Sequence, residues 1–438
     1  MLINYVEMRK LVKICVVGLG YIGLPTAAMF AKHGAEVVGV DINQHVVDKL
    51  NQGEIHIEEP GLGEVVQETL KQKKLSASLD VVGADVFIIA VPTPNNDDEY
   101  KSCDLTGVLT AVKEVIPNIR KGNILIIEST IAPRSMDDFI KPLIEDAGFV
   151  VGEDVFLVHC PERVLPGKIM DEIIFNNRIV GGVTPACSKM AAQVYSLFVK
   201  GEIIQTDAKT AEMSKLMENT FRDVNIALSN ELAKICKNLK INVLDVIEMA
   251  NKHPRVNLHQ PGPGVGGHCL AVDPYFIVAK TPEIANIIQM SRDVNVSMPL
   301  YVCENIEQLL KGIDSPKIAV FGVAYKGNTD DMRESPALEI IDVLYQKGYN
   351  VTVYDPYVKS ELFNLKTAEE AVEGADLILV LADHNQFKTM EYSQFVSKMR
   401  QPILFDARNC IPLNKKGEMK VVNFGNIHEV LQSDEVFA

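Results

Sequence analysis

The apolar positions of this chain fall into two patterns, short continuous runs and longer stretches with helical spacing. In the first half the continuous runs are bounded by glycine, proline and polar residues, which is typical of buried strands in a parallel sheet. We predict such strands at residues 10–17, 36–40, 85–91, 123–128, 155–159, 178–182 and 202–205. Predicted helices through residue 33 and over 185–199 alternate with these strands, as in an α/β domain.

The pattern changes after Thr206 and Asp207, either of which can cap a helix. Residues 208–239 contain no glycine or proline and carry apolar residues at helical spacing. This stretch predicts one long helix that joins the two halves of the chain. Further helices are predicted at 243–252 and 283–310, with a break or kink at Pro299.

An α/β pattern then starts again, with predicted strands at 317–321, 351–354, 376–381 and 402–405 and a helix at 336–347. The predicted fold is therefore α/β, with two Rossmann-like doubly wound domains joined by a central helical domain with one long helix. We expect domains at 1–206, 207–312 and 313–438. Residues 1–10 are expected to be a short extension, with Met8 an alternative start, and residues beyond about 425 a tail.

Composition narrows the function classes. Hydrophobic residues make up 47% of the chain and charged residues 23%, which is ordinary for a globular protein. The net charge of −15 and the absence of a dense Lys/Arg run argue against a nucleic-acid partner. No apolar run reaches membrane-spanning length, so we expect no membrane partner. The eight cysteines form no close-spaced pairs, so we expect no metal site, and thiols in a reducing cytoplasm.

A dinucleotide fingerprint follows the first predicted strand, in the sequence Gly18-Leu19-Gly20-Tyr21-Ile22-Gly23. Glycines allow a tight turn that brings backbone N–H groups and a helix N-terminus to a pyrophosphate. Asp41 ends the next strand, 18 positions after the last glycine, which suits a ribose 2′-hydroxyl and favours NAD over NADP. Thr93, at the end of another strand, is either a cofactor contact or a turn residue.

A second glycine-rich stretch, residues 264–274, carries Cys269 and Asp273. Cysteine suits an oxidation in which a thiolate attacks an aldehyde, because the thiohemiacetal can lose a second hydride and leave a thioester that water cleaves. The other interpretation, a small buried hydrophobe, fits Cys15, Cys236 and Cys303 better, since these lie in apolar patterns.

Partners for this chemistry come from several predicted elements. Lys215 and Asn219 are four residues apart and share a helix face, and Lys215 could stabilise an oxyanion. Alternatively, Glu212 could pair with Lys215, or the whole face could be solvated. Thr130, after a strand, could position substrate or water. Glu162 is the leading candidate for a base, a ribose contact or a salt-bridged loop carboxylate being the alternatives.

The second α/β half lacks a full GxGxxG motif and is predicted to bind a different phosphate-bearing ligand. Lys326, Arg333 and Arg408 are cations at or just beyond its strand ends.

Together these motifs resemble the UDP-glucose/GDP-mannose dehydrogenase family over nearly the whole chain. The matching residues are Gly18-Gly20-Gly23, Val91-Pro92-Thr93-Pro94, Ser129-Thr130, Pro161-Glu162, Glu212-x-x-Lys215-x-x-x-Asn219, Gly266-Gly267-x-Cys269 with Asp273, Tyr325-Lys326 and Arg333-Glu334-Ser335-Pro336. The resemblance implies a four-electron oxidation of a nucleotide-sugar C6 hydroxyl to a carboxylate, with two NAD consumed.

The resemblance also implies roles for individual residues. The implied catalytic residues are Cys269, Lys215, Asp273, Asn219, Glu162 and Thr130. The implied NAD contacts are Gly18, Gly20, Tyr21, Ile22, Gly23, Asp41, Thr93, Thr130 and Arg333. The implied UDP-sugar contacts are Glu162, Arg163, Val164, Lys215, Asn219, Arg222, Arg255, His259, Gly266, Tyr325, Lys326 and Arg408. A homodimer built on the long helix is also implied, with Arg255 reaching the neighbouring site.

Two segments bear on the sugar. Residues 160–168 and 255–269 look like the branch that oxidises UDP-N-acetyl-D-mannosamine, because Arg163 and His268 depart from the glucose-type pattern. UDP-N-acetylglucosamine and UDP-glucose are the alternatives within the family. Outside it, a two-electron 3-hydroxyacid dehydrogenase and a non-catalytic nucleotide-sugar sensor are the alternatives. The resemblance also implies a product that feeds cell-surface polysaccharide synthesis.

Overall fold

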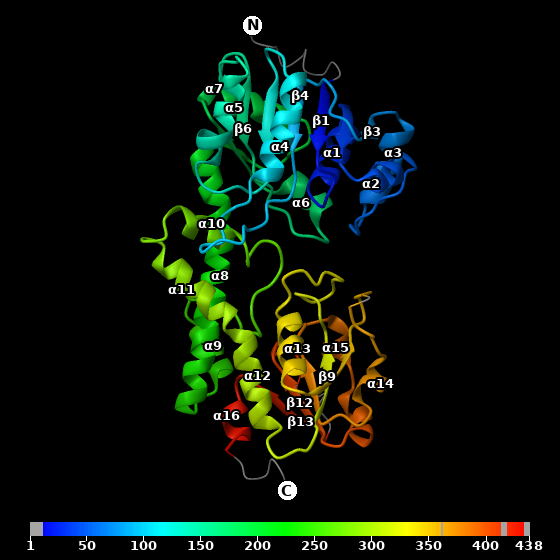
Figure 1. The fold of residues 1–438 in the computed structure, drawn as a ribbon, viewed down its shortest axis with the longest axis vertical. Coiled ribbons are helices and arrows are strands. Elements are labelled where there is room, and N and C mark those ends of the chain that lie inside the picture. The colour runs from blue at the N-terminus through cyan, green and yellow to red at the C-terminus, as the bar shows by residue number, and fades with distance from the viewer. Residues whose placement is uncertain (1–11, 361, 413–417, 433–438) are drawn as a thin grey trace. The chain divides into compact units, whose positions relative to one another are not determined.

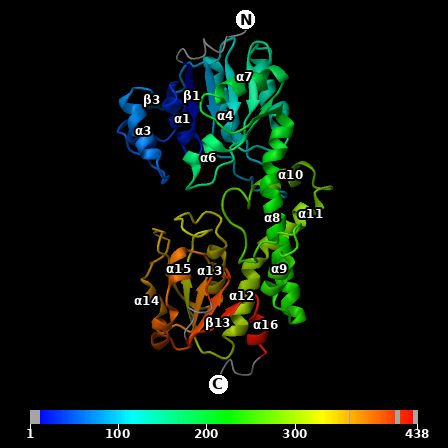
Figure 2. The same cartoon turned by 180° about the vertical axis from the view of Figure 1, so that it is seen from behind.

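The protein is described by a computed structural model that covers residues 12–360, 362–412 and 418–432. It consists of two compact units. The amino-terminal unit comprises residues up to Glu218 together with Tyr275–Pro282, and the carboxyl-terminal unit comprises Asn219–Pro274 and the residues from Glu283 onward. The division falls inside helix α8 (Ala208–Leu239), which is unbroken in both views (Figures 1 and 2).

The amino-terminal unit is built on an eight-stranded sheet of order β3-β2-β1-β4-β5-β6-β7-β8. Its strands are β1 (Lys13–Val17), β2 (Glu36–Val40), β3 (Leu75–Ser78), β4 (Val86–Ile89), β5 (Ile124–Ile127), β6 (Phe156–His159), β7 (Arg178–Gly182) and β8 (Ile203–Asp207). Neighbouring strands are parallel except β6 and β7, which are antiparallel. The sequence did not indicate this reversal.

Helices connect and cover these strands. They are α1 (Gly23–Lys32), α2 (Gln44–Asn51), α3 (Leu62–Lys71), α4 (Thr106–Val115), η1 (Ile116–Asn118), η2 (Met136–Ile140), α5 (Lys141–Asp146), α6 (Ile169–Phe175), α7 (Pro185–Tyr195) and α10 (Asp273–Lys280). Helix α1 is buried from Gly23 to Ala31 and joins β1 to β2 in the predicted βαβ unit. The helix predicted at 185–199 ends at Tyr195.

The carboxyl-terminal unit contains a five-stranded parallel sheet of order β10-β9-β11-β12-β13. Its strands are β9 (Lys317–Phe321), β10 (Asn350–Tyr354), β11 (Leu377–Val380), β12 (Ile403–Asp406) and β13 (Lys420–Asn423). Alternate residues face two separate cores: Ile318 and Val320 belong to one, and Ala319 and Phe321 to the other. Burial on both faces confirms the doubly wound α/β prediction for this half.

Besides the part of α8 that belongs to it, this unit contains the helices α9 (Val243–Ala250), α11 (Asn286–Val296), α12 (Met298–Leu309), α13 (Pro336–Gln346), α14 (Ala368–Val372), α15 (Asn385–Thr389), η3 (Tyr392–Lys398) and α16 (Ile427–Val430). Helices α12 and α13 contribute to the core on one face, and α14, α15 and η3 to the core on the other.

Two boundary predictions need correction. The helix predicted over 283–310 is two helices, α11 and α12, separated at Ser297, because Pro299 fits the first turn of a new helix but not a helix interior. The tail predicted beyond residue 425 was wrong, since α16 packs there and Ile427 is fully buried in the core. The predicted extension at 1–10 and residues 433–438 lie outside the described residues.

The start of helix α8 is held by two carboxylates. Asp207 caps it, accepting a hydrogen bond from the Thr210 amide at 3.0 Å, as predicted for this position. Glu212 is fully buried and accepts hydrogen bonds from the amides of Arg134 and Met136, at 2.6 and 2.8 Å. Glu212 thus ties α8 to the loop before η2, where pairing with Lys215 had been an alternative.

Burial of Glu212 raises its pKa to about 7, despite the two amide donors that lower it. Between pH 4.5 and about 7 the folded state therefore binds a proton that the unfolded state releases, so the free energy of unfolding falls as pH rises through this window. We expect Glu212→Gln to remove about 2 kcal/mol of this decline between pH 5 and 7. Denaturant unfolding at several pH values measures it.

Glu231→Gln, at an exposed position of the same helix, is the matched control and should keep the wild-type pH dependence. An identical decline in wild type and Glu212→Gln would contradict the assignment.

Candidate active site

The first polar cluster lies where the order of the amino-terminal sheet reverses, between β1 and β4. Ligands of such sheets bind outside the carboxyl ends of the strands at this point. The fingerprint loop starts there, with Gly18 at a φ of +93°. A Cβ on Gly23 would lie 1.8 Å from the Gly18 carbonyl oxygen, so glycine is required for α1 to begin there. Gly20 has open space around it and leaves its backbone accessible.

Asp41 ends β2 beside this loop. Its carboxylate accepts hydrogen bonds from the amides of Leu19 at 3.0 Å and Asn43 at 2.9 Å. The acidic residue is therefore held against the fingerprint, as a ribose contact requires. The next side chain, Ile42, is 94% exposed. Sequence reasoning missed this residue, although an apolar side chain directly after the acid was a usable signal.

The ends of β4 and β5 are joined by side chains that the sequence had singled out. The Thr93 hydroxyl donates to the Thr130 carbonyl oxygen at 2.6 Å, and the Ser129 hydroxyl donates to the Val91 carbonyl oxygen at 2.7 Å. Thr93 and Thr130 are both partly exposed. The structure thus brings these two predicted residues together, and it gives Thr93 a turn contact as well.

Glu162, Arg163 and Val164 follow β6. Glu162 is buried, and its two oxygens accept from the Arg163 amide at 2.7 Å and from Arg178 at 2.6 Å. The Arg163 guanidinium instead pairs with Glu218 at 2.6 Å and donates to the Asn177 carbonyl oxygen. Val164 packs against the core of the unit.

Lys215 is buried on α8 in the same unit, and His159 is close enough to sense its charge. The fully buried His159 has its Nδ1 3.0 Å from the Ile127 carbonyl oxygen. Burial, with a contribution from the positive charge of Lys215, lowers the pKa of His159 to about 3. The ring is therefore neutral, and within the described residues nothing hydrogen-bonds its Nε2.

The carboxyl-terminal unit brings three of the predicted catalytic residues together. Asn219 and Asp273 are buried, and the Asn219 amide nitrogen donates to the Asp273 carboxylate at 2.6 Å. The Asp273 amide donates to the Cys269 carbonyl oxygen at 2.9 Å, which forms the turn that opens α10. Cys269 itself is exposed, whereas the other cysteines are buried or partly buried. Lys215 lies one turn before Asn219 along α8.

Glycine is needed in the loop that leads to Cys269. A Cβ on Gly266 would lie 2.2 Å from the Glu334 carbonyl oxygen, and one on Gly267 would lie 2.8 Å from the Tyr325 ring. The Gly267 amide donates to the Arg333 carbonyl oxygen at 3.2 Å. The loop thus lies directly on segments that carry predicted ligand contacts. The Arg333 side chain forms a bidentate pair with Asp331, at 2.9 and 2.7 Å.

Three predicted substrate contacts lie elsewhere in this unit. His259 is partly buried, and burial, followed by the nearby charge of Arg222, lowers its pKa. Arg222 and Arg255 are exposed, and Arg255 lies 3.4 Å from His253. Among the described residues, Arg255 makes no hydrogen bond or ion pair to another predicted substrate contact.

Another polar cluster lies at the reversal of the second sheet, between β9 and β11. Asp383, after β11, accepts from the Gly327 amide at 2.9 Å and pairs with Arg408, after β12, at 3.2 Å. Lys326 lies with its amine 5.7 Å from the centre of the Tyr325 ring. The structure therefore brings Lys326 and Arg408 to one strand edge. Asp383 was missed, although an acid directly after a predicted strand could have indicated it.

The second sheet is not built for a dinucleotide. Asp355 follows β10 as Asp41 follows β2, but its carboxylate accepts from the Val323 amide at 2.8 Å and the Tyr357 amide at 2.9 Å, and His384 covers it at 3.2 Å. Burial raises the pKa of Asp355, but the hydrogen bonds outweigh this and hold it below its ordinary value. The Asp355 carboxylate is therefore engaged by hydrogen bonds within the protein and is not available to a ribose.

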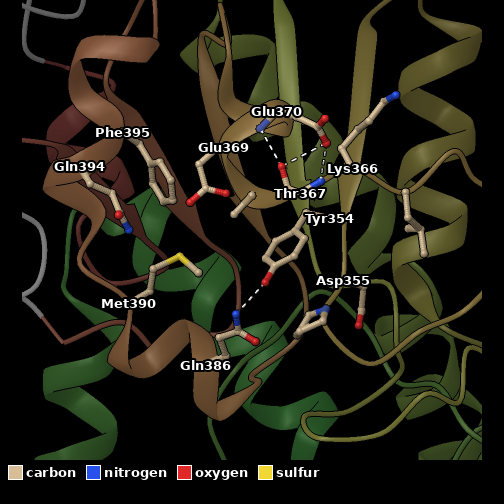
Figure 3. Close-up of a pocket in the computed structure, with 13 residues that line it drawn as sticks. Tyr354, Asp355, Lys366, Thr367, Glu369, Glu370, Gln386, Met390, Gln394 and Phe395 are labelled. Atoms are coloured by element: carbon tan, nitrogen blue, oxygen red, sulfur yellow. Dashed lines mark hydrogen bonds between the residues drawn. The ribbon is translucent and has the colours of Figure 1, made fainter.

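A cavity of about 660 Å³ opens beside β10, lined by Tyr354, Glu369, Gln386 and Met390 among others (Figure 3). Another, of about 500 Å³, is lined by Leu244, Glu248, Asn251, Lys252, Gln260 and Asn409. None of the predicted site residues lines either cavity. We therefore place the candidate site by its side chains, at the strand ends and the cysteine loop.

Within residues 12–360, 362–412 and 418–432, no helix is both long enough and apolar enough to cross a membrane. No group of three or more histidine, cysteine, aspartate or glutamate side chains there could hold a metal ion.

The chain is similar in sequence and in structure to several sugar-nucleotide dehydrogenases. The chain is 47% identical to a UDP-N-acetyl-D-mannosamine dehydrogenase of Methanococcus maripaludis, over 94% of this chain and 97% of the relative. It is 46% identical to an NDP-N-acetyl-D-galactosaminuronic acid dehydrogenase of Ralstonia nicotianae, over 88% and 94%. A solved UDP-N-acetyl-mannosamine dehydrogenase of S. aureus is 58% identical, with a TM-score of 0.89 over 95% of this chain and 99% of that chain.

Domain models of one family also match: an NAD binding domain at residues 12–199, a central domain at 209–297 and a UDP binding domain at 319–412. The residues present fit NAD, because the fingerprint loop is open at Gly20 and Asp41 is held beside it. The chain therefore belongs to the UDP-glucose/GDP-mannose dehydrogenase family and is an NAD-dependent UDP-sugar dehydrogenase.

Proposed function

We propose that this enzyme oxidises UDP-N-acetyl-D-mannosamine at C6 to UDP-N-acetyl-D-mannosaminuronate, with Cys269 as the nucleophile. The observation that carries the proposal is the exposed Cys269 on a glycine-rich loop, with the buried Asn219–Asp273 pair one turn away. Exposure suits a thiol that must meet a substrate carbon, and the buried pair is fixed enough to orient groups around that carbon.

The reaction takes four electrons from the sugar. The residues that would hold NAD are Gly18, Gly20, Tyr21, Ile22, Gly23, Asp41, Thr93, Thr130 and Arg333, and bound NAD would supply the hydride acceptor for both oxidations. In the first, the C6 hydroxyl loses a proton to a base and becomes an aldehyde. The Cys269 thiolate then bonds to the aldehyde carbon and gives a thiohemiacetal, whose oxyanion Lys215 and Asn219 stabilise.

The second oxidation converts the thiohemiacetal to a thioester. Water, positioned by Thr130, attacks this carbon, with Glu162 accepting the proton and the Cys269 thiolate leaving. Asp273 holds Asn219 in place through their 2.6 Å hydrogen bond, and it can accept or donate a proton near the cysteine. One sugar alcohol, one water and two NAD+ thus give one carboxylate, two NADH and three protons.

The UDP moiety is assigned to the carboxyl-terminal sheet. Lys326 and Arg408, gathered at the β9 and β12 ends, supply positive charge for the diphosphate, with Tyr325 and Gly266 beside them. Glu162, Arg163, Val164, Lys215, Asn219, Arg222 and His259 are assigned to the sugar and its surroundings. We place the reaction in the cytoplasm, since none of the eight cysteines, all in the described part of the chain, forms a disulfide.

Arg163 and His268 support the choice of an acetamido sugar, because both depart from the glucose-type pattern. Arg163 pairs with Glu218 and donates to the Asn177 carbonyl oxygen, which fixes the loop after Glu162, and His268 is exposed beside Cys269. An N-acetyl-D-galactosamine nucleotide is the second candidate. The Ralstonia relative, which is named an NDP-N-acetyl-D-galactosaminuronic acid dehydrogenase, is nearly as similar to this chain as the mannosamine enzymes are.

The sugar assignment predicts a substrate order. We expect kcat/KM for UDP-N-acetyl-D-mannosamine to exceed that for the N-acetylglucosamine, N-acetylgalactosamine and glucose nucleotides by about tenfold or more, because a site shaped for one C2 group leaves polar atoms unpaired with another. Initial rates of NADH formation over this panel measure the order, and end-point assays should give two NADH per sugar. A stoichiometry of one, with aldehyde released, would argue against the thioester route.

The nucleophile assignment predicts that Cys269→Ala loses acid formation by about 10³-fold or more, because no thioester can form. Product analysis by mass spectrometry, with NADH release, measures it. Cys236→Ala makes the same substitution at a buried cysteine in the core and should keep nearly full activity. Acid formation at the wild-type rate by Cys269→Ala would exclude Cys269 as the nucleophile.

We further propose a homodimer built on α8, with Arg255 acting in the neighbouring subunit. Phe221, Leu228 and Ile235 are spaced seven apart on this helix and are 64, 52 and 46% exposed. Such a stripe on one helix face supports a second copy of the same helix as its partner. Arg255 is exposed in the same unit and is available to a partner.

Arg255 acting across subunits predicts complementation. Arg255→Ala and Cys269→Ala should each be inactive alone, yet a mixed dimer holds one site with both residues intact. The mixed dimer, co-expressed from differently tagged subunits and purified by both tags, should therefore show about half of wild-type activity. The unfractionated random mixture, in which half of the dimers are mixed, should show about a quarter. A mixed dimer without activity would place Arg255 in its own subunit's site.

A further inference from the structure

A buried ion cluster lies behind Glu162 in the amino-terminal unit. The Arg178 guanidinium, at the start of β7, donates to Glu162 at 2.6 Å and to Glu128 at 2.8 Å. Its Nε donates to the Cys160 sulfur at 3.3 Å, and its plane lies over the Tyr195 ring at 4.2 Å. Arg178 is 4% exposed and Glu128 2%, so these contacts fix the guanidinium in one position.

Glu128, at the end of β5, holds Arg178 from the other side. Its carboxylate accepts from the Tyr195 hydroxyl at 2.6 Å and from the Thr26 hydroxyl at 3.1 Å. Thr26 belongs to α1, the helix that follows the dinucleotide fingerprint, and Glu128 directly precedes Ser129 and Thr130. One hydrogen-bonded chain therefore runs from the NAD-binding helix through Glu128 and Arg178 to Glu162.

The cluster contains two carboxylates for one guanidinium. A buried cluster with two carboxylates and one guanidinium takes up a proton more readily than an isolated ion pair, because two negative charges close together disfavour ionisation of both carboxyls. Burial raises the pKa of Glu128, Arg178 opposes the rise and the charge of Glu162 adds to it.

We propose that Arg178 and Glu128 are positioning residues for the reaction: Arg178 fixes the Glu162 carboxylate, and Glu128 fixes Arg178 from the other side. This rests on the proposed role of Glu162 as the base. Burial of the ion cluster is what makes this role possible, because a surface ion pair would hold a carboxylate far less firmly.

Three other titratable or charged side chains lie around the cluster: Tyr195, Cys160 and Arg163. From α7, Tyr195 reaches it as a neutral donor, because burial raises its pKa well above the ordinary value. Burial likewise raises the pKa of Cys160 to about 11, so its thiol stays protonated. On the loop itself the Arg163 side chain points to Glu218 of α8. Neither Tyr195 nor Cys160 therefore adds a charge to the cluster at neutral pH.

The test is the pH profile of kcat with saturating NAD and UDP-sugar. Glu128→Gln keeps the shape, since its oxygen can accept from Arg178 and Tyr195 and its nitrogen can donate to Thr26, but it removes a negative charge. Removing this charge makes uptake of a proton by the cluster less favourable, so the acidic limb of the kcat profile should move down by about one pH unit. Arg178→Lys loses the planar guanidinium, whose Nη2 donates to both carboxylates while its Nε donates to Cys160, and should lower kcat by about tenfold or more with little change in KM.

Glu59→Gln is the matched control. Glu59 is a buried carboxylate of the same unit, but it accepts only backbone amides, from Gly167 and Ile169. Its replacement should lower the unfolding temperature without moving the acidic limb. If Glu128→Gln does not fold, Tyr195→Phe is the second variant; losing the hydroxyl leaves Glu128 protonated more often, so the limb should move in the same direction by less.

Glu162→Gln separates this inference from the function it rests on. If Glu162→Gln retains full kcat, the proposed role of Glu162 is wrong. If Glu162→Gln is inactive, while Glu128→Gln and Tyr195→Phe fold and leave the acidic limb in place, Glu162 is the base and the positioning role of the cluster is overturned.

Discussion

Parallel strands that end at one edge constrain this structure more than any single contact. Each sheet reverses its strand order once, between β1 and β4 in the first and between β9 and β11 in the second. At a reversal the connecting helices leave on opposite faces, so the loops part and expose backbone N–H groups and polar side chains. The fingerprint glycines, Thr93, Lys326 and Asp383 all owe their positions to this geometry.

The same topology serves two ligands because one position differs in its surroundings. Asp41 is held beside the first fingerprint with an exposed Ile42 next to it, and so remains available to a ribose. Asp355, at the matching place, is covered by His384 and accepts from the amides of Val323 and Tyr357. Burying that carboxylate removes the dinucleotide site and makes the turn after β9 rigid, which suits a loop that carries Tyr325 and Lys326.

Sequence patterns predicted elements with strong local signals. β2 and β9 were predicted at their exact bounds, and α8 was predicted over 208–239, because apolar runs and helical spacing do not depend on distant residues. The antiparallel step at β7 and the packed α16 were missed, since pairing direction and terminal packing depend on contacts with residues far along the chain.

The candidate site divides in the same way. Residues in motifs, such as Gly18, Cys269 and Asp273, could be named from the sequence, because the chemistry demands particular types at particular spacings. The contacts that support them could not. Asn219 was named, but its hydrogen bond to Asp273 across 54 positions was not predicted, and neither was the one from Arg178 to Glu128 across 50. Neither pair leaves a local trace; a lone arginine at the start of a buried strand was the sole hint of Arg178.

This asymmetry has a physical origin in burial. Cys269, the proposed nucleophile, is exposed, and its loop has glycines where Glu334 and Tyr325 leave no room for a Cβ. Glu162, the proposed base, is buried, where a charge is costly unless neighbours compensate for it. A buried carboxylate therefore requires partners drawn from several elements, and β5, β6, β7 and α7 supply them. The proposed nucleophile can lie in a local motif, whereas the proposed base depends on the whole sheet.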